Sequence, residues 1–182
     1  MKDNRLNLIE SECLLCAQVG VMQEVSALFG PQDRNRYGGD IHETWKSHIE
    51  GAAGEYAVAK FLGMHWDFSV FRGDDFRKKP DVGPYQVRQA ERHHYRLTLR
   101  KGADTDKPDV PFILVTGTMP NYRVRGWVYG REAMQDRYWS DPNNRGYAWW
   151  VPVDDLHSME TLPDWRKEVE VEKEPRFWEG DL

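Results

Sequence analysis

The sequence predicts a domain of the α/β (α+β) class, in which N-terminal helices flank a mixed central sheet. Apolar residues recur at three- and four-residue steps over 8–28, and a second helix is expected over 41–62. Short β-type runs separated by Gly, Pro and Asp follow that second helix. The length of 182 residues suits one domain with its own core. We therefore expect residues 1–162 to form a single domain and residues 163–182 to form an acidic arm.

The two expected helices have recognisable ends and different surfaces. The first repeats Leu15 and Val19 along one side and stops at Gly30-Pro31, and Gly63 is placed to cap the second. The middle of the second helix, "EGAAGEYAVAKFLG", is rich in Gly and Ala. Because such residues are small, that helix is expected to lie very close to the structure it covers.

Six segments after the second helix have the composition of strands. They are "DFSVF", "YQVRQA", "YRLTLR", "FILVTGT", "YRVRGWVYG" and "AWWVPV". "FILVT" is apolar at successive positions, as in a central strand covered on both faces. "REAMQDRYW" is expected to be a short helix, and "DDLHSMETL" a turn or short helix.

The segment "KKPDVGPYQVRQA" is the candidate site. Gly83 and Pro84 are expected to make a tight turn, after which Gln86 and Arg88 point to the same face of a strand. Asp81 lies just before the turn, close enough to reach Gln86 across the two arms. The ordinary structural explanation is that Asp81 caps the turn and Arg88 pairs with an acid.

A second acid, Glu55, lies in the small-residue stretch of the second helix, which could direct its carboxylate at an edge of the sheet. With Asp81 and Gln86 it would supply hard oxygen ligands, which suit Mg²⁺ (or Mn²⁺) shared with a substrate phosphate. Such a metal would lower the pKa of a bound water, and the Arg88 cation would stabilise charge developing on the phosphate. The alternative for Glu55 is simple solvation.

The order of these motifs resembles the PD-(D/E)XK, or restriction-endonuclease-like, nuclease superfamily. Four segments of the chain are similar to segments of small proteins of that superfamily that are often found in bacteriophages: "HIEGAAGEYAVAKFLG", "KPDVGPYQVR", "FILVTG" and "VRGWVYGREA". The resemblance covers roughly residues 41–133. It implies that Glu55 is the helical acid, Asp81 the metal-binding Asp, Gln86 the acid of the D/E-x-K element and Arg88 its Lys.

Three features depart from that family. Gln86 is a weaker metal ligand than Glu, and Arg88 carries a permanent charge and cannot act as a base. The family core also has a helix between its third and fourth strands, where "RKGADTDKPDVP" is too short and polar to form one. The resemblance implies a divalent-metal-dependent DNA endonuclease. The alternative is a non-catalytic protein on the same fold that binds nucleic acid or inhibits a host enzyme.

Charge is distributed unevenly along the chain. The net charge of the chain is −5. Residues 72–101 nevertheless contain nine Lys and Arg and only four acids, whereas the segment from residue 154 onward is acidic. Candidate nucleic-acid contacts are Lys78, Lys79, Arg92 and His93. Arg123 and Arg125 either extend this basic face or point to solvent. DNA is the expected partner, and the acidic arm is a candidate protein-binding segment.

Other features limit the remaining function classes. No apolar run is expected to span a bilayer, and no signal peptide is recognised, so the expected location is the cytoplasm, that of the host if a bacteriophage encodes the chain. Cys13 and Cys16 are expected to be buried thiols, since no other metal-ligand pairs accompany them. Glu50 is expected to be solvated. Many enzymes of the resembled family work as dimers, so a homodimer is compatible with this prediction.

Overall fold

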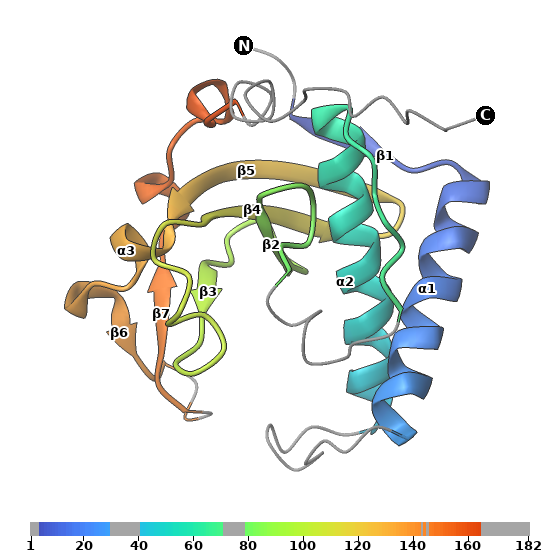
Figure 1. Cartoon of the computed structure of the whole chain (residues 1–182), viewed down its shortest axis with the longest axis horizontal. Coiled ribbons are helices and arrows are strands. Elements are labelled where there is room, and N and C mark those ends of the chain that lie inside the picture. The colour runs from blue at the N-terminus through green and yellow to red at the C-terminus, as the bar shows by residue number, and fades with distance from the viewer. Residues whose placement is uncertain (1–3, 30–40, 71–78, 143, 145, 165–182) are drawn as a thin grey trace, which may run out of the picture.

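The computed structural model describes residues 4–29, 41–70, 79–142, 144 and 146–164, without the side chains of 41–43. At its centre is a four-stranded sheet in the order β1-β5-β4-β2 (Figure 1). Its strands are β1 (Arg5–Asn7), β2 (Gln86–Ala90), β4 (Pro111–Thr118) and β5 (Asn121–Tyr129). β2 is parallel to β4, whereas β4 pairs with β5 and β5 with β1 in antiparallel fashion. The sheet is therefore mixed, as the sequence predicts.

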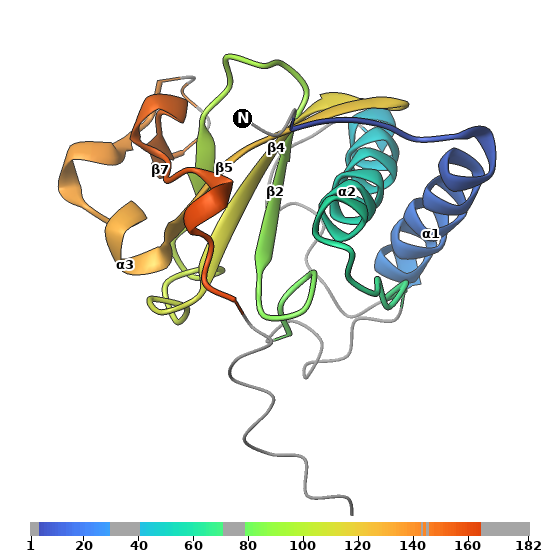
Figure 2. The same cartoon turned by 90° about the horizontal axis from the view of Figure 1, so that it is seen from above.

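Different layers cover the two faces of this sheet (Figure 2). Helices α1 (Glu10–Phe29) and α2 (Ile41–Leu62) lie on one side, with α2 next to the sheet. The other side carries a small antiparallel sheet of order β3-β7-β6, together with the short helix α3. The bounds of these elements are Leu97–Leu99 for β3, Gly130–Ala133 for α3, Trp139–Ser140 for β6 and Ala148–Val151 for β7.

Three single-turn 3₁₀ helices complete the described elements. They are η3 (Asp136–Tyr138), η4 (Val153–Asp155) and η5 (Met159–Thr161). The expected short helix over "REAMQDRYW" is thus α3 followed by η3. The segment expected to be a turn or short helix holds η4 and η5. Of the segment expected to be an acidic arm, only Pro163 and Asp164 belong to the described residues.

The central strand β4 serves two hydrophobic cores. Ile113 and Val115 belong to the core beneath the helices, whereas Phe112 and Leu114 belong to the core beneath the small sheet. All four side chains are fully buried. This alternation confirms that "FILVT" is a strand covered on both faces.

Small residues of the helices allow the layers to approach closely. A Cβ placed on Gly54 of α2 would lie 2.8 Å from Cβ of Gln89 in β2, and one on Gly20 of α1 would lie 2.4 Å from Cα of Ile49. Both distances are too short for real side-chain atoms. The expected close packing of the Gly- and Ala-rich helix on the sheet is therefore confirmed.

Two local expectations were wrong. Residues 67–70 of "DFSVF" form no strand, because the backbone of Phe68 has a φ of 54° and interrupts any extended segment. The first apolar stretch does not begin as a helix, since residues 5–7 form β1 and α1 begins at Glu10. A further expectation is confirmed, because residues 100–110 form turns and no helix, as their short, polar sequence predicted. The finer restriction-endonuclease-like topology stays a prediction.

Helix α1 is more apolar than we expected. Its 20 residues are long and apolar enough to cross a membrane. Core helices of soluble proteins meet the same criterion. The prediction that no apolar run could span a bilayer therefore does not hold for α1 on length and composition alone.

Glu12 ties α1 to α2 and to its own first turn. Its carboxylate accepts hydrogen bonds from Lys60 Nζ at 2.7 Å, Tyr56 Oη at 2.9 Å and the Ile9 amide at 2.8 Å. Burial raises the pKa of Glu12, but these three donors outweigh burial and lower its pKa below the ordinary value of 4.5. Ionised Glu12 therefore stabilises the fold.

Replacing this carboxylate should make the free energy of unfolding less dependent on pH. Glu12→Gln is expected to lower the free energy of unfolding at pH 7 by about 1–2 kcal/mol, because charge-assisted hydrogen bonds are lost. Since the folded-state pKa is depressed, the contribution is present above the unfolded-state value and disappears as pH falls through the folded-state value. Urea unfolding of both proteins at pH 7 and pH 3 should show a difference that shrinks at pH 3. An equal difference at both pH values would contradict this assignment.

Candidate functional site

The predicted hairpin exists and holds Asp81 beside β2. Val82 and Tyr85 form an antiparallel bridge around the turn, and Gly83 adopts a φ of 54° that favours glycine. The Asp81 carboxylate accepts a hydrogen bond from the Val87 amide at 2.8 Å. Asp81 is therefore fixed at the amino end of β2 by the backbone of the strand itself.

Arg88 lies between two carboxylates. Its guanidinium is 3.6 Å from Asp81 Oδ2 and also donates to Asp104 Oδ1. Asp104 is only 2% exposed, and its second oxygen accepts the amide of Arg100 at 2.8 Å. The Arg88 guanidinium also lies 5.1 Å from the centre of the Phe112 ring. Arg88 is thus a positioned member of a partly buried ion-pair network in which Asp104 is the buried carboxylate.

Gln86 is buried and already bonded at both ends of its amide. Its Nε2 donates to the Lys79 carbonyl at 3.2 Å, and its Oε1 accepts from Lys107 Nζ at 3.2 Å. The side chain is 3% exposed. The amide oxygen that would complete a metal shell therefore accepts a hydrogen bond from an ammonium group.

Glu55 belongs to a different layer. It lies on α2, which packs against the face of β2 that carries Val87 and Gln89, whereas Gln86 and Arg88 point to the other face. The indole Nε1 of Trp66 donates to Glu55 Oε2 at 3.1 Å. The structure thus brings Asp81, Gln86 and Arg88 to one end of β2, and it places Glu55 on the helix across the sheet.

The donor set of these residues does not fit a divalent metal. Mg²⁺ needs several free oxygens, but those of Asp104 and Gln86 accept from cations or amides, and Arg88 occupies the space between the carboxylates. Among residues 4–29, 41–70 and 79–164, apart from 143 and 145, no three His, Cys, Asp or Glu side chains form a group able to hold a metal ion. The magnesium site stays a prediction that this geometry does not favour.

Glu50 is not solvated as expected. Its carboxylate accepts from the Tyr122 hydroxyl at 2.6 Å and from the Met119 amide at 3.3 Å. Burial, and then this hydrogen bond to Glu50, raises the pKa of Tyr122 well above its usual range. Glu50 therefore ties α2 to the β4–β5 turn and has a structural role.

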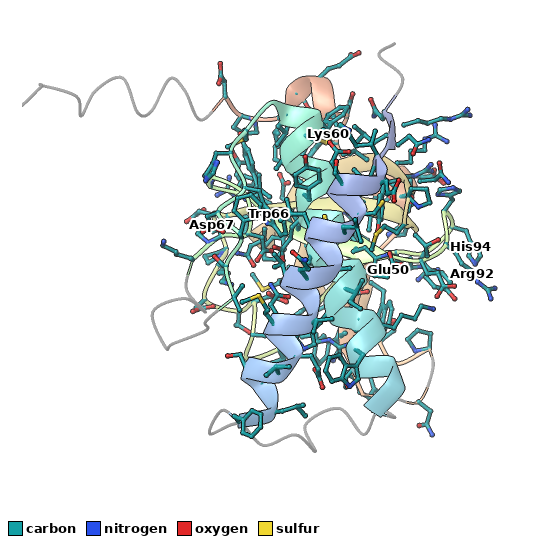
Figure 3. The ribbon with its side chains drawn as sticks, turned by 90° about the vertical axis from the view of Figure 1, so that its right-hand side faces the viewer. Glu50, Lys60, Trp66, Asp67, Arg92 and His94 are labelled. Carbon is teal, nitrogen blue, oxygen red and sulfur yellow. The ribbon has the colours of Figure 1, made fainter. Side chains whose placement is uncertain are left out.

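The residues predicted to contact nucleic acid lie in different parts of the chain. Lys78 lies outside the described residues, and Lys79 is exposed next to the hairpin. Arg92 and His93 are exposed in the turn that follows β2. Figure 3 shows Arg92 and His94 at the rim of the molecule, directed away from α2. Lys79 and Arg92 flank opposite ends of β2.

His93 marks a pocket of about 350 Å³ beside the edge strand β1. The pocket lining includes Arg5, Asn7, His93, Asn121 and Arg123. The His93 Nδ1 is 2.9 Å from Thr116 Oγ1 on β4, which places the imidazole over the sheet. The pocket is therefore rich in groups that can donate hydrogen bonds to an anion.

Two arginines stand directly opposite each other at this pocket. Arg5 of β1 pairs with Arg123 of β5 in antiparallel register, so both side chains lie on one face of the sheet. Like charges in this arrangement destabilise a sheet. Among the described residues, no carboxylate pairs with the Arg123 guanidinium. The pairing concentrates positive charge at the pocket.

Arg125, two residues after Arg123 on the same strand, adds to this positive charge. The β4–β5 register shifts between Leu114 and Val115, which leaves Arg125 as the extra residue of a bulge. Its Nε atom is buried without a hydrogen-bond partner in the described structure. Burial, and then the charge of Arg123, lowers the pKa of Arg125, while Asp154 acts in the opposite direction.

The sequence did not predict every member of the network around Arg88 or of the pocket beside β1. Asp104 and Lys107 lie in an irregular segment that carries no recognisable motif, and Arg5 belongs to a strand expected to lead into a helix. Of the residues that line the pocket, His93 and Arg123 were singled out from the sequence as candidate parts of a basic face. Comparisons with protein-family models, curated proteins and solved structures found no match to this chain.

Proposed function

We propose that the protein binds nucleic acid through the phosphate backbone, at the face formed by the pocket and the turn after β2. The observation that carries this proposal is the opposed pair Arg5 and Arg123 beside His93. Arginine presents a planar fork of donors that matches phosphate oxygens. A bound phosphate would accept hydrogen bonds from both guanidinium groups.

The surface continues beyond the pocket, which favours a polymer over a small free anion. Arg92, His94 and Arg96 are exposed in the segment that follows β2, next to pocket residue His93. A chain of phosphates can contact such a row at several points, and each contact releases counterions. The net charge of −5 does not oppose this, because the acidic residues concentrate from position 154 onward.

Hydrolysis is not part of the proposal. Asp81, Gln86 and Arg88 support each other and the hairpin through the bonds described above. Because the oxygens of Asp104 and Gln86 and one oxygen of Asp81 already accept hydrogen bonds, this cluster is poorly suited to hold a metal that activates water. We therefore favour the binding protein over the nuclease, although the sequence resemblance points to the nuclease.

A cleavage assay separates the two functions. Supercoiled plasmid, linear duplex, single-stranded DNA and RNA would be incubated with the parent protein and with Asp81→Ala, in Mg²⁺, in Mn²⁺ and in EDTA. We expect binding in EDTA by both proteins, and no cutting under any condition. Metal-dependent cutting by the parent that disappears in Asp81→Ala would overturn the proposal and establish the nuclease.

A further inference from the structure

Two asparagines extend the arginine pair of the pocket beside β1. Asn7 and Asn121 stand directly opposite each other in the register of β1 and β5, two residues from the pair Arg5 and Arg123. Residues two apart on a strand point to the same face, so the four side chains form two neighbouring cross-strand pairs. All four are exposed and line the pocket. The pocket therefore has a cationic part and an amide part, roughly 7 Å apart along the strands.

The two amides make hydrogen bonds that the arginines cannot make. A guanidinium group only donates, whereas a side-chain amide donates through its nitrogen and accepts through its oxygen. A phosphodiester offers acceptors alone and leaves the amide oxygens without a donor. Within the described part of the chain, neither the Asn7 nor the Asn121 side-chain amide has a hydrogen-bond partner. A ligand that uses the whole pocket therefore carries donors as well as acceptors next to its phosphate.

The His93 ring supplies a flat surface at the same pocket. Its Nδ1 is 2.9 Å from Thr116 Oγ1, and Thr116 is directly opposite Arg123, so the imidazole is held beside the arginine pair. Imidazole rings stack on unpaired bases in nucleic-acid complexes. The pocket volume of about 350 Å³ is in the range of sites that hold one small ligand. The pocket thus offers donors for a phosphate, amides for a polar edge and a ring for a flat group.

We infer that the pocket holds one unpaired nucleotide of a single-stranded nucleic acid. Arg5 and Arg123 hold its phosphate, and the edge of its base bonds to the two asparagine amides. A nucleotide carries its phosphate and its base on opposite sides of the sugar, so one nucleotide can contact both pairs. Base edges present donors and acceptors side by side, which match an amide. In a duplex the Watson–Crick edge is already paired, so single strands are the substrate class of the proposed nucleic-acid binding, on which this inference rests.

The turn after β2 favours a strand over a free nucleotide. Tyr95, two residues beyond His93, is 41% exposed, and its amide donates to the Arg92 carbonyl at 3.0 Å. The Tyr95 ring lies 5.9 Å from the guanidinium carbon of Arg92. An exposed ring next to a cation can stack a neighbouring base of a single strand. A free nucleotide has no second base for this ring.

A strand without bases separates base contacts from phosphate contacts. Fluorescence anisotropy in EDTA would compare a mixed-sequence single strand, an abasic strand of equal length and the duplex. We expect the parent to bind the single strand at least about tenfold more tightly than the abasic strand or the duplex, because a matched base-edge contact contributes about that factor. Equal affinity for the single strand and either of the other probes would overturn the inference and leave the proposed phosphate contacts standing. No binding to any of the three would overturn the proposed function as well.

A double substitution tests the amides themselves. Asn7→Ala with Asn121→Ala should weaken single-strand binding by about tenfold and leave the affinity for the abasic strand unchanged, which also shows that the pocket is still folded. Gln135→Ala removes an exposed amide outside the pocket and should change neither affinity. An asparagine variant that still prefers the single strand as strongly as the parent would contradict the base contacts. A free mononucleotide that binds as tightly as the strand would contradict a polymer as the ligand.

Discussion

Asp104→Ala is expected to lower the free energy of unfolding by about 2–3 kcal/mol, because a buried carboxylate that accepts charge-assisted and backbone hydrogen bonds is lost. Asp104 is 2% exposed and holds both the Arg88 guanidinium and the Arg100 amide. Removing its carboxylate leaves Arg88 with Asp81 alone, at 3.6 Å. Urea unfolding monitored by tryptophan fluorescence would measure the loss as a lower midpoint with an unchanged slope.

The exposed pair of Arg131 and Asp109 provides the matched control. Asp109 is 77% exposed, so Asp109→Ala removes an ion pair of the same chemistry in water. Surface ion pairs contribute roughly 0–1 kcal/mol, and this variant should fall in that range. Equal effects of the two substitutions would show that Asp104 does not hold Arg88 in the manner described.

The second large effect concerns nucleic-acid binding. Arg5→Ala combined with Arg123→Ala is expected to weaken binding by about 10–100-fold at moderate salt and to reduce the slope of log K against log salt by about 2, since two phosphate contacts are lost. Fluorescence anisotropy at several salt concentrations would measure both the affinity and the slope.

Arg137→Ala separates this effect from a general loss of positive charge. Arg137 is exposed on η3 and lies 4.5 Å from the Tyr138 ring, in the layer of the small sheet. Its replacement should leave affinity nearly unchanged. If Arg137→Ala weakened binding as much as one pocket arginine, the cationic pocket would not be the contact surface.

The sequence predicted those elements that a local pattern of apolar residues defines. The helical period defined α1 and α2, and β4 was recognised because its residues are apolar on both faces. β1 could not be predicted, because its three residues form a strand only through pairing with β5. "DFSVF" has strand composition, but the left-handed backbone at Phe68 depends on its surroundings.

The candidate site was also predicted only in the part that depends on neighbouring residues in the sequence. The spacing of Gln86 and Arg88 predicted that both point to one face, and the turn placed Asp81 nearby. The partners that decide their chemistry are distant in sequence: Asp104 is 16 residues from Arg88, and Lys107 is 21 residues from Gln86. Tertiary packing brings them together, and so the sequence alone could not distinguish a metal site from an ion-pair network.

The salt dependence of nucleic-acid binding by the parent protein in EDTA tests the central claim most directly. Labelled single-stranded and duplex DNA would be titrated by fluorescence anisotropy at several concentrations of sodium chloride between 50 and 200 mM, a range in which phosphate-directed binding changes steeply. We expect binding without any divalent metal, and affinity that falls linearly on a log–log plot. An absence of binding in EDTA that Mg²⁺ restores, or affinity independent of salt, would contradict the claim.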